Sequence, residues 1–363
     1  MHKKIIIAGG GTGGHIFPAL AIANALKRKD SNIEILFVGA KGKMEMEKVP
    51  QAGYPIKGID IAGFNRSSLI KNIGLPIKLL KSFFQVRKIF SAFQPDAVLG
   101  VGGYSTYPVL RYAQNKGIPT FIHESNSYAG KSNVLLGKRA ARIFTGSKGM
   151  EKFFPAQKIL VTGNPVRKNI AEGGVSREAA LAYFSLDPDK TTVLVIGGSL
   201  GAKSINETIL QQLDQLLQAG LQVIWQTGKS IDAHLIDGMK TKKGVWVNEF
   251  ITEMQIAYAA ADIVMARAGA MTVTEICVTK RPTLFVPYPF AAEDHQTANA
   301  MQLVNENAAW MVKDSEVKEK GIQWILKLAK DKVLQAQMRS NLEKLAIRDA
   351  DERVASEILN EIK

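Results

Sequence analysis

Four short glycine-rich segments carry residue types that bind anions, and each follows an apolar run. They are Gly9–Gly14, Gly100–Gly103, Gly197–Gly201 and Ala268–Thr272. A glycine-rich turn at the start of a helix presents unpaired backbone N–H groups, and the helix dipole favours negative charge there. A single turn of this kind is weak support, because many strand–helix turns carry glycine for packing. Four of them in one chain predict a ligand that bears phosphate.

Two common kinds of phosphate site are disfavoured. Gly9–Gly14 matches the dinucleotide fingerprint G-x-G-x-x-G, which also needs an acidic residue at the end of the second strand. That strand ends at Gly39 and Ala40, and the next acidic residue is Glu45. This argues against a dehydrogenase. The chain has no G-x-x-x-x-G-K-[ST] segment, which argues against a P-loop nucleotidase.

Side chains that could transfer a proton stand close to such turns. His15 directly follows the first turn, inside the first turn of a predicted helix. His123 ends the predicted strand Pro119–His123 and Glu124 follows it, so we expect both at the rim of a cleft. An exposed or capping histidine is the ordinary alternative for His15. A metal site is not predicted, because the histidines lack ligand spacing and Cys277 is the only cysteine.

The elements that must position these residues alternate along the chain. Segments with helical spacing, such as Pro18–Arg28 and Pro76–Phe93, separate most of the short β-branched runs. The predicted strands are Lys4–Ala8, Ile33–Val38, Ala97–Gly100, Pro119–His123, Arg142–Thr145, Thr192–Ile196, Leu221–Gln226, Val245–Asn248, Ile263–Met265 and Thr283–Val286. This alternation is typical of βαβ units on a parallel sheet.

The pattern restarts after about residue 165, and both halves begin with a buried strand, a glycine-rich turn and a helix. We therefore predict an α/β protein with two Rossmann-like domains whose parallel sheets face a cleft. The expected domains are 1–165 and 166–340, joined near Gly163–Gly174. The pattern over Ser340–Lys363 predicts a last helix, at about residues 341–363. It could pack back on the first domain, although the sequence leaves open which domain receives it.

Composition and charge separate the two halves. The 363 residues are 46% apolar and 22% charged, which excludes a mostly disordered chain. The net charge is +14, yet residues 1–165 alone hold 24 Lys and Arg against eight Asp and Glu. The halves therefore face different partners. The apolar run Ile5–Ala8 is too short for a signal peptide, and no stretch approaches the ~20 apolar residues that span a bilayer.

Part of the positive charge lies in a basic, apolar segment, residues 66–93, inside a stretch without acidic side chains. Its six Lys and Arg alternate with Leu, Ile, Val and Phe over more positions than one packing stripe needs. Two interpretations stay open: a helix packed on its sheet with lysines outside, or a surface that docks on anionic lipid. Nucleic acid is not predicted, because no nucleic-acid motif is present and the aromatic residues cluster with aliphatic ones.

Seven segments in this order resemble the MurG family of two-domain GT-B glycosyltransferases, over nearly the whole chain. They are Gly9–Ala23, Gly100–Pro108, His123–Gly130, Thr162–Arg167, Gly197–Ala202, Arg267–Glu275 and Glu293–Ala300. Two positions depart from the family pattern: Ser125 and Leu200 stand where the family often has glutamine. Either departure could alter a contact to sugar or phosphate.

The resemblance implies an inverting transferase that moves N-acetylglucosamine from UDP-GlcNAc to the C4 hydroxyl of the muramoyl sugar of undecaprenyl-pyrophosphoryl-MurNAc-pentapeptide. It implies no cofactor and no metal. Segment 66–93 would hold the protein peripherally on an anionic membrane surface, at the cytoplasmic face of the bacterial cell membrane. Two alternatives remain: a GT-B transferase with another acceptor, and a non-catalytic protein that binds a nucleotide sugar or a lipid.

The resemblance also assigns donor contacts. The residues implied to bind UDP-GlcNAc are Thr12, Gly13, Gly14, Asn126, Arg167, Ser199, Ile251, Ala270, Met271, Thr272, Val273, Thr274, Glu275 and Gln296. Ser199 and the segment beginning at Ala270 would hold the diphosphate, and Glu275 would accept the ribose hydroxyls. Ile251 would contact the uracil through its backbone, and Gln296 would bind the sugar hydroxyls.

Three further residues would line the acceptor side, namely His15, Tyr104 and Glu124, with the lipid pyrophosphate near the glycine turns of the first domain. Transfer needs a base within hydrogen-bond reach of the acceptor hydroxyl. His15 is the expected base, and Glu124 is the second choice.

Overall fold

The computed structural model describes residues 2–63, 74–198, 200–231 and 233–362. The chain divides into two compact units. Unit 1 comprises Met1–Arg167 and Asp349–Lys363, and unit 2 comprises Lys168–Arg348. Each unit has a parallel β-sheet with helices packed on it, so the prediction of an α/β protein is confirmed.

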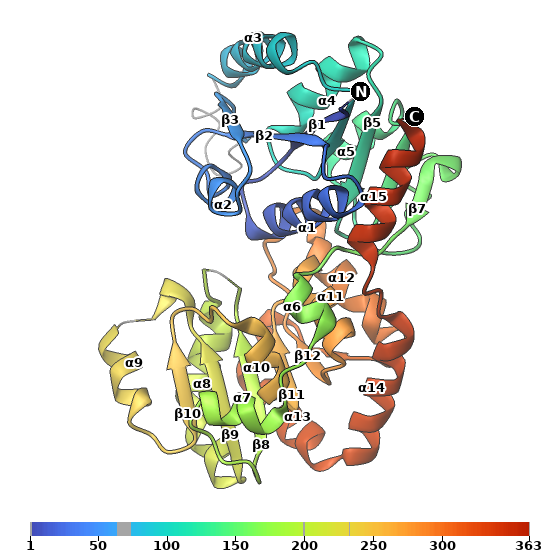
Figure 1. Ribbon diagram of the computed structural model, residues 1–363. Helices are drawn as coiled ribbons and strands as arrows, with labels where there is room; N and C mark the ends of the chain where they lie inside the picture. The colour runs from blue at the N-terminus through green and yellow to red at the C-terminus, as the bar shows by residue number, and fades with distance from the viewer. Residues whose placement is uncertain (1, 64–73, 199, 232, 363) are drawn as a thin grey trace. The chain divides into compact units, whose positions relative to one another are not determined.

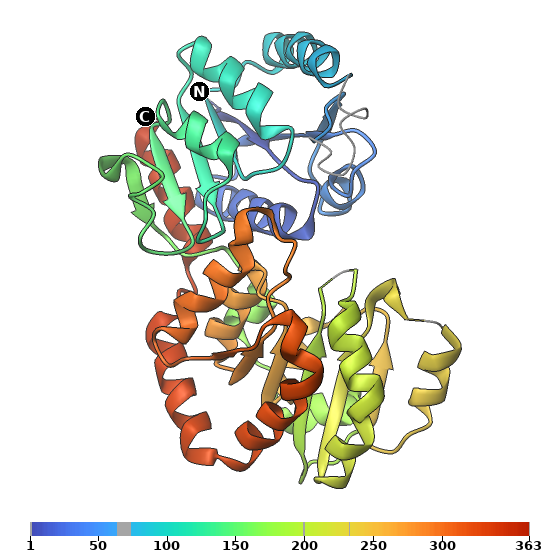
Figure 2. The same cartoon turned by 180° about the vertical axis from the view of Figure 1, so that it is seen from behind.

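In the residues that the structure describes, unit 1 forms a seven-stranded parallel sheet with helices on both faces (Figures 1 and 2). Its strands are β1 (Lys4–Ala8), β2 (Glu34–Ala40), β3 (Ile56–Ile59), β4 (Ala97–Gly100), β5 (Thr120–Glu124), β6 (Arg142–Thr145) and β7 (Ile159–Val161). Its helices are α1 (Gly13–Lys29), α2 (Glu45–Gln51), α3 (Leu75–Phe93), α4 (Thr106–Asn115), α5 (Lys131–Gly137) and α15 (Ala350–Glu361). The order β3-β2-β1-β4-β5-β6-β7 makes β1 the switch point, beyond whose carboxyl end such sheets bind ligands.

The first strand shows how the sequence builds this layered core. Ile5 and Ile7 are fully buried and pack with α1 and α15 on one face of the sheet. Ile6 and Ala8 are equally buried and pack with α3 and α4 on the other face. A strand covered on both faces has to be apolar at every position, which explains the uninterrupted run before the first glycine turn.

The described part of unit 2 repeats this plan with a six-stranded sheet in the order β10-β9-β8-β11-β12-β13. Its strands are β8 (Thr191–Ile196), β9 (Leu221–Gln226), β10 (Val245–Asn248), β11 (Ile263–Ala266), β12 (Thr283–Phe285) and β13 (Trp310–Met311). Its helices are α6 (Lys168–Glu172), α7 (Arg177–Tyr183), α8 (Lys203–Gln218), α9 (Ala233–Lys240), α10 (Met254–Ala260), α11 (Ala270–Thr279), α12 (His295–Val304), α13 (Val317–Lys330) and α14 (Lys332–Leu345). Here β8 lies at the switch point, between β9 and β11.

The end of the chain differs from the prediction of one helix over Ser340–Lys363. Helix α14 ends at Leu345 in unit 2, and α15 begins at Ala350 and packs beside α1 in unit 1 (Figure 1). Arg28 of α1 holds α15 by ion pairs to Asp351 and Glu352. The amphipathic pattern continues through 340–363, but the chain crosses from one unit to the other in its middle, and this interrupts the helix.

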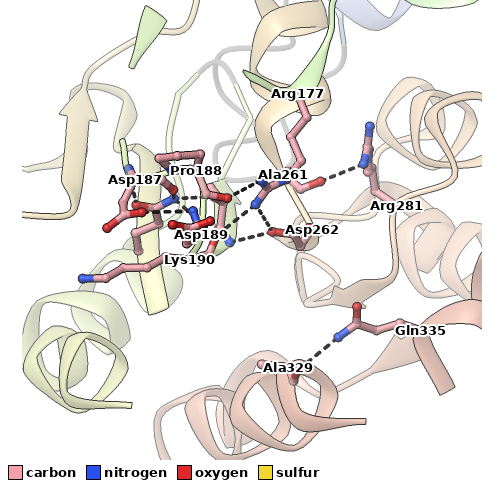
Figure 3. A network of polar contacts seen from close by, with 12 residues as sticks. Arg177, Asp187, Pro188, Asp189, Lys190, Ala261, Asp262, Arg281, Ala329 and Gln335 are labelled. Atoms are coloured by element: carbon pink, nitrogen blue, oxygen red, sulfur yellow. Dashed lines mark hydrogen bonds and ion pairs between the residues drawn. The ribbon is translucent and has the colours of Figure 1, made fainter. Parts of the chain in front are cut away.

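In unit 2, a polar network lies at the amino ends of the neighbouring strands β8 and β11 (Figure 3). Arg177 donates to the carbonyl oxygens of Pro188 at 2.7 Å and Lys190 at 2.9 Å, and to Oδ2 of Asp262 at 3.0 Å. The same carboxylate oxygen accepts the N–H of Thr192 at 2.8 Å. These bonds fix the position of the amino end of β8. The glycine turn follows the carboxyl end of the same strand.

Candidate active site

The glycine turns after β1 and β4 pack directly against each other. The N–H of Gly10 donates to the carbonyl oxygen of Gly102 at 3.1 Å. A Cβ atom at Gly103, where φ is +91°, would lie 2.3 Å from the carbonyl oxygen of Gly10. Packing between the two turns therefore requires glycine at position 103, before any ligand is considered.

In unit 1, the N–H groups suited to an anion lie at the start of α1. Those of the preceding turn already donate to other groups. Those of Gly9, Gly10 and Gly11 donate to Val38, Gly102 and Glu45. The N–H groups of Gly13 and Gly14 stand at the beginning of the helix, ahead of its first i→i−4 bond, and the first turn holds no acidic residue. This arrangement suits a phosphate group.

His15 lies in this first turn, as predicted, and its ring is held by the backbone. Its Nδ1 lies 3.0 Å from the carbonyl oxygen of Gly10. A carbonyl oxygen only accepts, so Nδ1 carries the proton in this contact, and in the neutral ring the lone pair is on Nε2. Nε2 lies over the second turn, where a Cβ atom at Gly102 would be 2.7 Å from it. The imidazole therefore has the tautomer that a general base needs.

Glu124 is the last residue of β5, and its carboxylate braces the loop that follows. Oε1 accepts from the backbone N–H of Asn126 at 3.1 Å and from its side-chain amide at 3.3 Å. Oε2 accepts from the N–H of Gly130 at 3.0 Å and from the amide of Asn133 at 2.9 Å. With Glu124 only 4% exposed, these donors occupy the lone pairs that a base would use.

His123 does not lie at a cleft rim, and this expectation is wrong. Its side chain is 0% exposed, with Nε2 3.4 Å from the carbonyl oxygen of Gly163 and Nδ1 3.3 Å from Oγ of Ser125. Burial lowers the pKa of His123 to about 4, since a charged ring would lose its hydration. Strand β5 continues through Glu124, so residue 123 points into the packed layer. Ser125, one of the two departures from the family pattern, contacts this histidine.

Two other predicted residues of unit 1 flank these turns. The ring of Tyr104 is half exposed and lies against Gly63, where a Cβ atom would come within 2.0 Å of it. The guanidinium of Arg167 lies 5.4 Å from the ring centroid of Phe17 in α1. A cation is thereby placed beside the helix whose N-terminus suits phosphate.

One acidic residue that the sequence prediction set aside lies beneath the first turn. Glu45 is 1% exposed, and its Oε2 accepts the N–H of Gly11 at 2.7 Å. Its Oε1 accepts the N–H of Ala40 at 2.9 Å. The carboxylate therefore bonds to the backbone at the end of β2 and is not available as a ribose anchor.

In unit 2, the predicted segment 270–275 forms the start of α11, directly beyond β11. The first helical bond runs from the N–H of Val273 to the carbonyl oxygen of Gly269 at 3.0 Å. The N–H groups of Ala270, Met271 and Thr272 precede this bond, and no acidic residue stands in the turn. The start of α11 is therefore a second helix N-terminus suited to phosphate.

Glu275 lies one turn further along α11 and is 8% exposed. The hydroxyl of Tyr258 donates to its Oε2 at 2.9 Å, which fixes the carboxylate in one orientation. Thr274 lies beside it and donates from its hydroxyl to the carbonyl oxygen of Ala270 at 2.9 Å. A fixed carboxylate one turn from an N-terminus suited to phosphate can accept hydroxyl groups of a nucleotide sugar.

Gln296 is the second residue of α12, beyond the carboxyl end of β12. Its Oε1 accepts the N–H of Tyr288 at 3.0 Å, which leaves its amide nitrogen as the donating end. Glu293 and Asp294 precede the helix with φ of +54° and +51°, conformations that cost non-glycine residues energy. The turn before α12 is therefore held in a strained shape next to a predicted ligand-binding residue.

The sequence prediction missed Arg267, a residue that contacts three segments of unit 2: the turn after β12, the start of α8 and the segment after β13. Arg267 follows β11, is 9% exposed, and donates to the carbonyl oxygens of Val286 and Pro287 at 3.0 and 3.1 Å. It also pairs with Asp314 and donates to Oγ of Ser204 in the first turn of α8 at 3.1 Å. A cation directly after a buried strand was the available signal.

Ile251, Ser199 and part of the basic segment remain to be placed. Ile251 lies between β10 and α10 and is buried, so only its backbone can meet a ligand. Ser199 lies outside the described residues, as do residues 64–73 of the basic segment. Within the residues that the structure describes, no three His, Cys, Asp or Glu side chains gather as a metal site would require.

Each unit thus presents helix N-termini for phosphate beyond the carboxyl ends of a parallel sheet. Two Rossmann-like units of this kind define the GT-B class of glycosyltransferases. The fold is similar to the crystal structure of Acinetobacter baumannii MurG, with a TM-score of 0.80 and 30% identity over 99% of this chain and 100% of that chain. It is also similar to the glycotransferase of kitacinnamycin, with a TM-score of 0.78 and 15% identity over the full length of both chains.

Sequence comparison narrows the class. The model of the glycosyltransferase family 28 N-terminal domain matches residues 5–145, and that of the C-terminal domain matches residues 192–354. A curated relative from Parabacteroides distasonis is 47% identical over 358 residues, which cover 98% of this chain and 97% of the relative. Its name is UDP-N-acetylglucosamine–N-acetylmuramyl-(pentapeptide) pyrophosphoryl-undecaprenol N-acetylglucosamine transferase. The chain belongs to this MurG family, within glycosyltransferase family 28.

Proposed function

We propose that this protein transfers N-acetylglucosamine from UDP-GlcNAc to the C4 hydroxyl of the muramoyl sugar in undecaprenyl-pyrophosphoryl-MurNAc-pentapeptide. The observation that carries the proposal is the 47% identity, over 98% of the chain, to a relative named for this transfer. The geometry supports it, because the described residues that the resemblance assigns lie beyond strand carboxyl ends in both units. The product is a lipid-linked disaccharide precursor of peptidoglycan.

Acceptor activation is assigned to His15. Its Nδ1 donates to Gly10, so Nε2 can take the proton of the attacking hydroxyl. Glu124 was the second choice, but hydrogen bonds to its loop already occupy its carboxylate. We assign Glu124 the task of shaping the loop that carries Asn126. Tyr104, half exposed beside the second glycine turn, is assigned to the acceptor side.

Donor binding is assigned mainly to unit 2. The N-terminus of α11 would hold the diphosphate, because its N–H groups and dipole stabilise the negative charge that grows on departing UDP. Glu275, oriented by Tyr258, would accept the ribose hydroxyls, and Gln296 would donate to the sugar. These groups stabilise the leaving group without a metal ion. From unit 1, Arg167 would add a positive charge.

Residues Thr12, Gly13 and Gly14 would contact the donor sugar from unit 1, together with Asn126. They stand at the start of α1, next to the proposed base. Inversion at the anomeric carbon then needs one displacement: the acceptor oxygen attacks, UDP leaves, and His15 keeps the proton. No glycosyl-enzyme forms in this scheme.

A turnover assay tests the proposal. Release of UDP from UDP-GlcNAc is measured with and without a soluble analogue of the lipid acceptor. We expect release only with the analogue, a loss of at least a hundredfold in His15→Ala, and a folded His15→Ala protein that still binds UDP. Release with a diacylglycerol acceptor instead would identify another GT-B activity. UDP-GlcNAc binding without release under any condition would leave a non-catalytic binding protein.

Attachment to an anionic membrane surface is proposed for the outer face of α3. Ile77, Leu80 and Phe84 are 72%, 61% and 59% exposed, and they share one face of the helix. Val86 and Phe90 are buried on the opposite face, against the sheet. The buried face of α3 is therefore packed on the sheet, and its exposed face is the surface assigned to lipid in this proposal.

The charges support the same surface. Lys78, Lys81, Arg87 and Lys88 are exposed along α3, around its apolar face. Apolar side chains ringed by lysine and arginine are typical of helices that lie in the interface of anionic membranes. In the described part of the chain, no helix is both long enough and apolar enough to span a bilayer. Peripheral docking at the cytoplasmic face would bring unit 1 to its lipid-linked acceptor.

Vesicle flotation separates docking from simple packing. Binding to phosphatidylglycerol vesicles should fall in Leu80→Ser/Phe84→Ser and in Lys78→Glu/Lys88→Glu, and it should weaken with salt. Val333→Ser is the matched control, because Val333 is 81% exposed on α14 of unit 2. Equal flotation of all variants would contradict the assignment of α3.

A further inference from the structure

A buried carboxylate lies under the first glycine turn, and neither the proposed donor contacts nor the acceptor contacts use it. Glu45 stands at the first position of α2 and is 1% exposed. Its two oxygens accept the N–H groups of Gly11 at 2.7 Å and Ala40 at 2.9 Å. A charged group is rarely buried this completely unless its hydrogen bonds are needed.

The surrounding glycines are shaped around this carboxylate. A Cβ atom at Gly10 would lie 2.3 Å from Cδ of Glu45, and one at Gly39 would lie 2.5 Å from its Cγ. Neither position could carry a side chain while Glu45 keeps its place. The first turn and the end of β2 therefore leave space for this one side chain.

The contact leads directly to the proposed base, through a single peptide group. The N–H of Gly11 and the carbonyl of Gly10 belong to the same peptide plane, where they point in opposite directions. Glu45 holds the N–H side, and Nδ1 of His15 lies 3.0 Å from the carbonyl oxygen. Rotation of this peptide plane would break both contacts together.

Holding the peptide plane sets the tautomer of the imidazole. While the carbonyl of Gly10 faces Nδ1, the proton stays on Nδ1 and Nε2 can accept another. A carboxylate on the N–H side also polarises the peptide group, which strengthens the carbonyl as an acceptor. The arrangement does for His15 what a directly bonded carboxylate does in a catalytic triad, with one peptide group between them.

We propose that Glu45 is a positioning residue for the transferase reaction: it locks the Gly10–Gly11 peptide, and this keeps the proton of the neutral His15 ring on Nδ1, as a base acting through Nε2 requires. The inference rests on the proposed function through the role of His15. Glu45 itself touches neither substrate.

The test compares Glu45→Gln with Glu47→Gln. Glutamine keeps the size of Glu45, but its NH2 group cannot accept one of the two N–H bonds. Glu47 stands on the same helix with an exposed side chain, so it controls for the change of charge. We expect Glu45→Gln to lower kcat about ten- to hundredfold, and Glu47→Gln to leave it unchanged.

A double-mutant cycle shows whether Glu45 acts through the base. In a His15→Ala background, Glu45→Gln should cause no further loss of kcat, because the group that it positions is already gone. An equal loss in both backgrounds would overturn the inference and show a general structural role. Retained UDP binding and an unchanged circular dichroism spectrum establish that each variant is folded.

Nitrogen NMR of the histidine rings gives a reading that does not depend on activity. Wild-type His15 should show a protonated Nδ1, and Glu45→Gln should shift population toward the Nε2-protonated tautomer. Should the glutamine variant not fold, Glu45→Asp shortens the reach by one methylene group and is expected to shift the tautomer in the same direction. An unchanged tautomer in the folded variant would overturn the inference even if the wild type proved inactive. Absent transfer with an intact tautomer effect would refute the proposed function alone.

Discussion

We expect the buried imidazole of His123 to make unit 1 sensitive to mild acid. Its pKa is lowered to about 4 by burial, whereas in the unfolded chain an imidazole titrates near pH 6.5. Between these values the unfolded state binds a proton that the folded state excludes, so the stability present above about pH 6.5 is lost as the pH falls toward 4. The difference in pKa corresponds to a loss of about 2 kcal/mol at about pH 5 and about 3 kcal/mol at about pH 4.

Urea unfolding at several pH values measures this loss. All four tryptophans of the chain, Trp225, Trp246, Trp310 and Trp324, belong to unit 2, so their fluorescence follows that unit as an internal reference. Circular dichroism follows both units. We expect the urea midpoint of the transition seen only by circular dichroism to fall as the pH falls from about 7.5 to about 5. The free energy of unfolding from this transition should fall by about 2 kcal/mol over that range.

His123→Gln removes the titrating group and should flatten this pH dependence, whatever it does to stability at neutral pH. The control is His2→Gln, because His2 is exposed. Asp60 does not interfere, since Gln85 and the nearby lysines lower its pKa to about 2, below the range studied. Parallel pH dependences for wild type and His123→Gln would refute the reasoning.

Three further predictions follow from individual contacts. Tyr258→Phe removes the donor that orients Glu275, so UDP should bind about tenfold more weakly by calorimetry; an unchanged Kd would contradict the ribose role. Arg177→Lys cannot reproduce the forked hydrogen bonds that join the amino ends of β8 and β11. It should lower the free energy of unfolding of unit 2 by about 1–2 kcal/mol in tryptophan-detected unfolding, and no change would show that the network is dispensable. Gly103→Ala should abolish turnover because its Cβ meets the backbone, while Gly117→Ala, with a similar positive φ and open space, should not; equal activity of the two would refute the close packing of the glycine turns.

The sequence predicted the interior of both sheets and missed strands at their edges. The ten predicted strands are present within two residues of their expected bounds. Nine of them lie inside a sheet, where burial on both faces makes them apolar, and β10 is the one edge strand among them. The strands β3, β7 and β13 were missed, and each lies at the edge of a sheet. They are two to four residues long and partly exposed, so they carry no apolar run that stands out.

The glycine turns and His15 could be found from the sequence because their signal is local. The roles of Glu45 and Arg267 could not, since their partners lie on other strands and loops. Nothing in the segment around Glu45 distinguishes it from Glu47, and only the folded chain buries one of them. His123 was misplaced for a related reason, because β5 continues through Glu124 and is buried along its whole length.

The return of α15 to unit 1 has a consequence for synthesis on the ribosome. Unit 2 is an insertion in the sequence of unit 1, between Arg167 and Asp349. The face of α1 that packs with Val354 and Ile358 therefore stays uncovered until the whole of unit 2 has been translated. The unit that is translated first is completed last, and during that interval its apolar surface is open to chaperones or to other nascent chains.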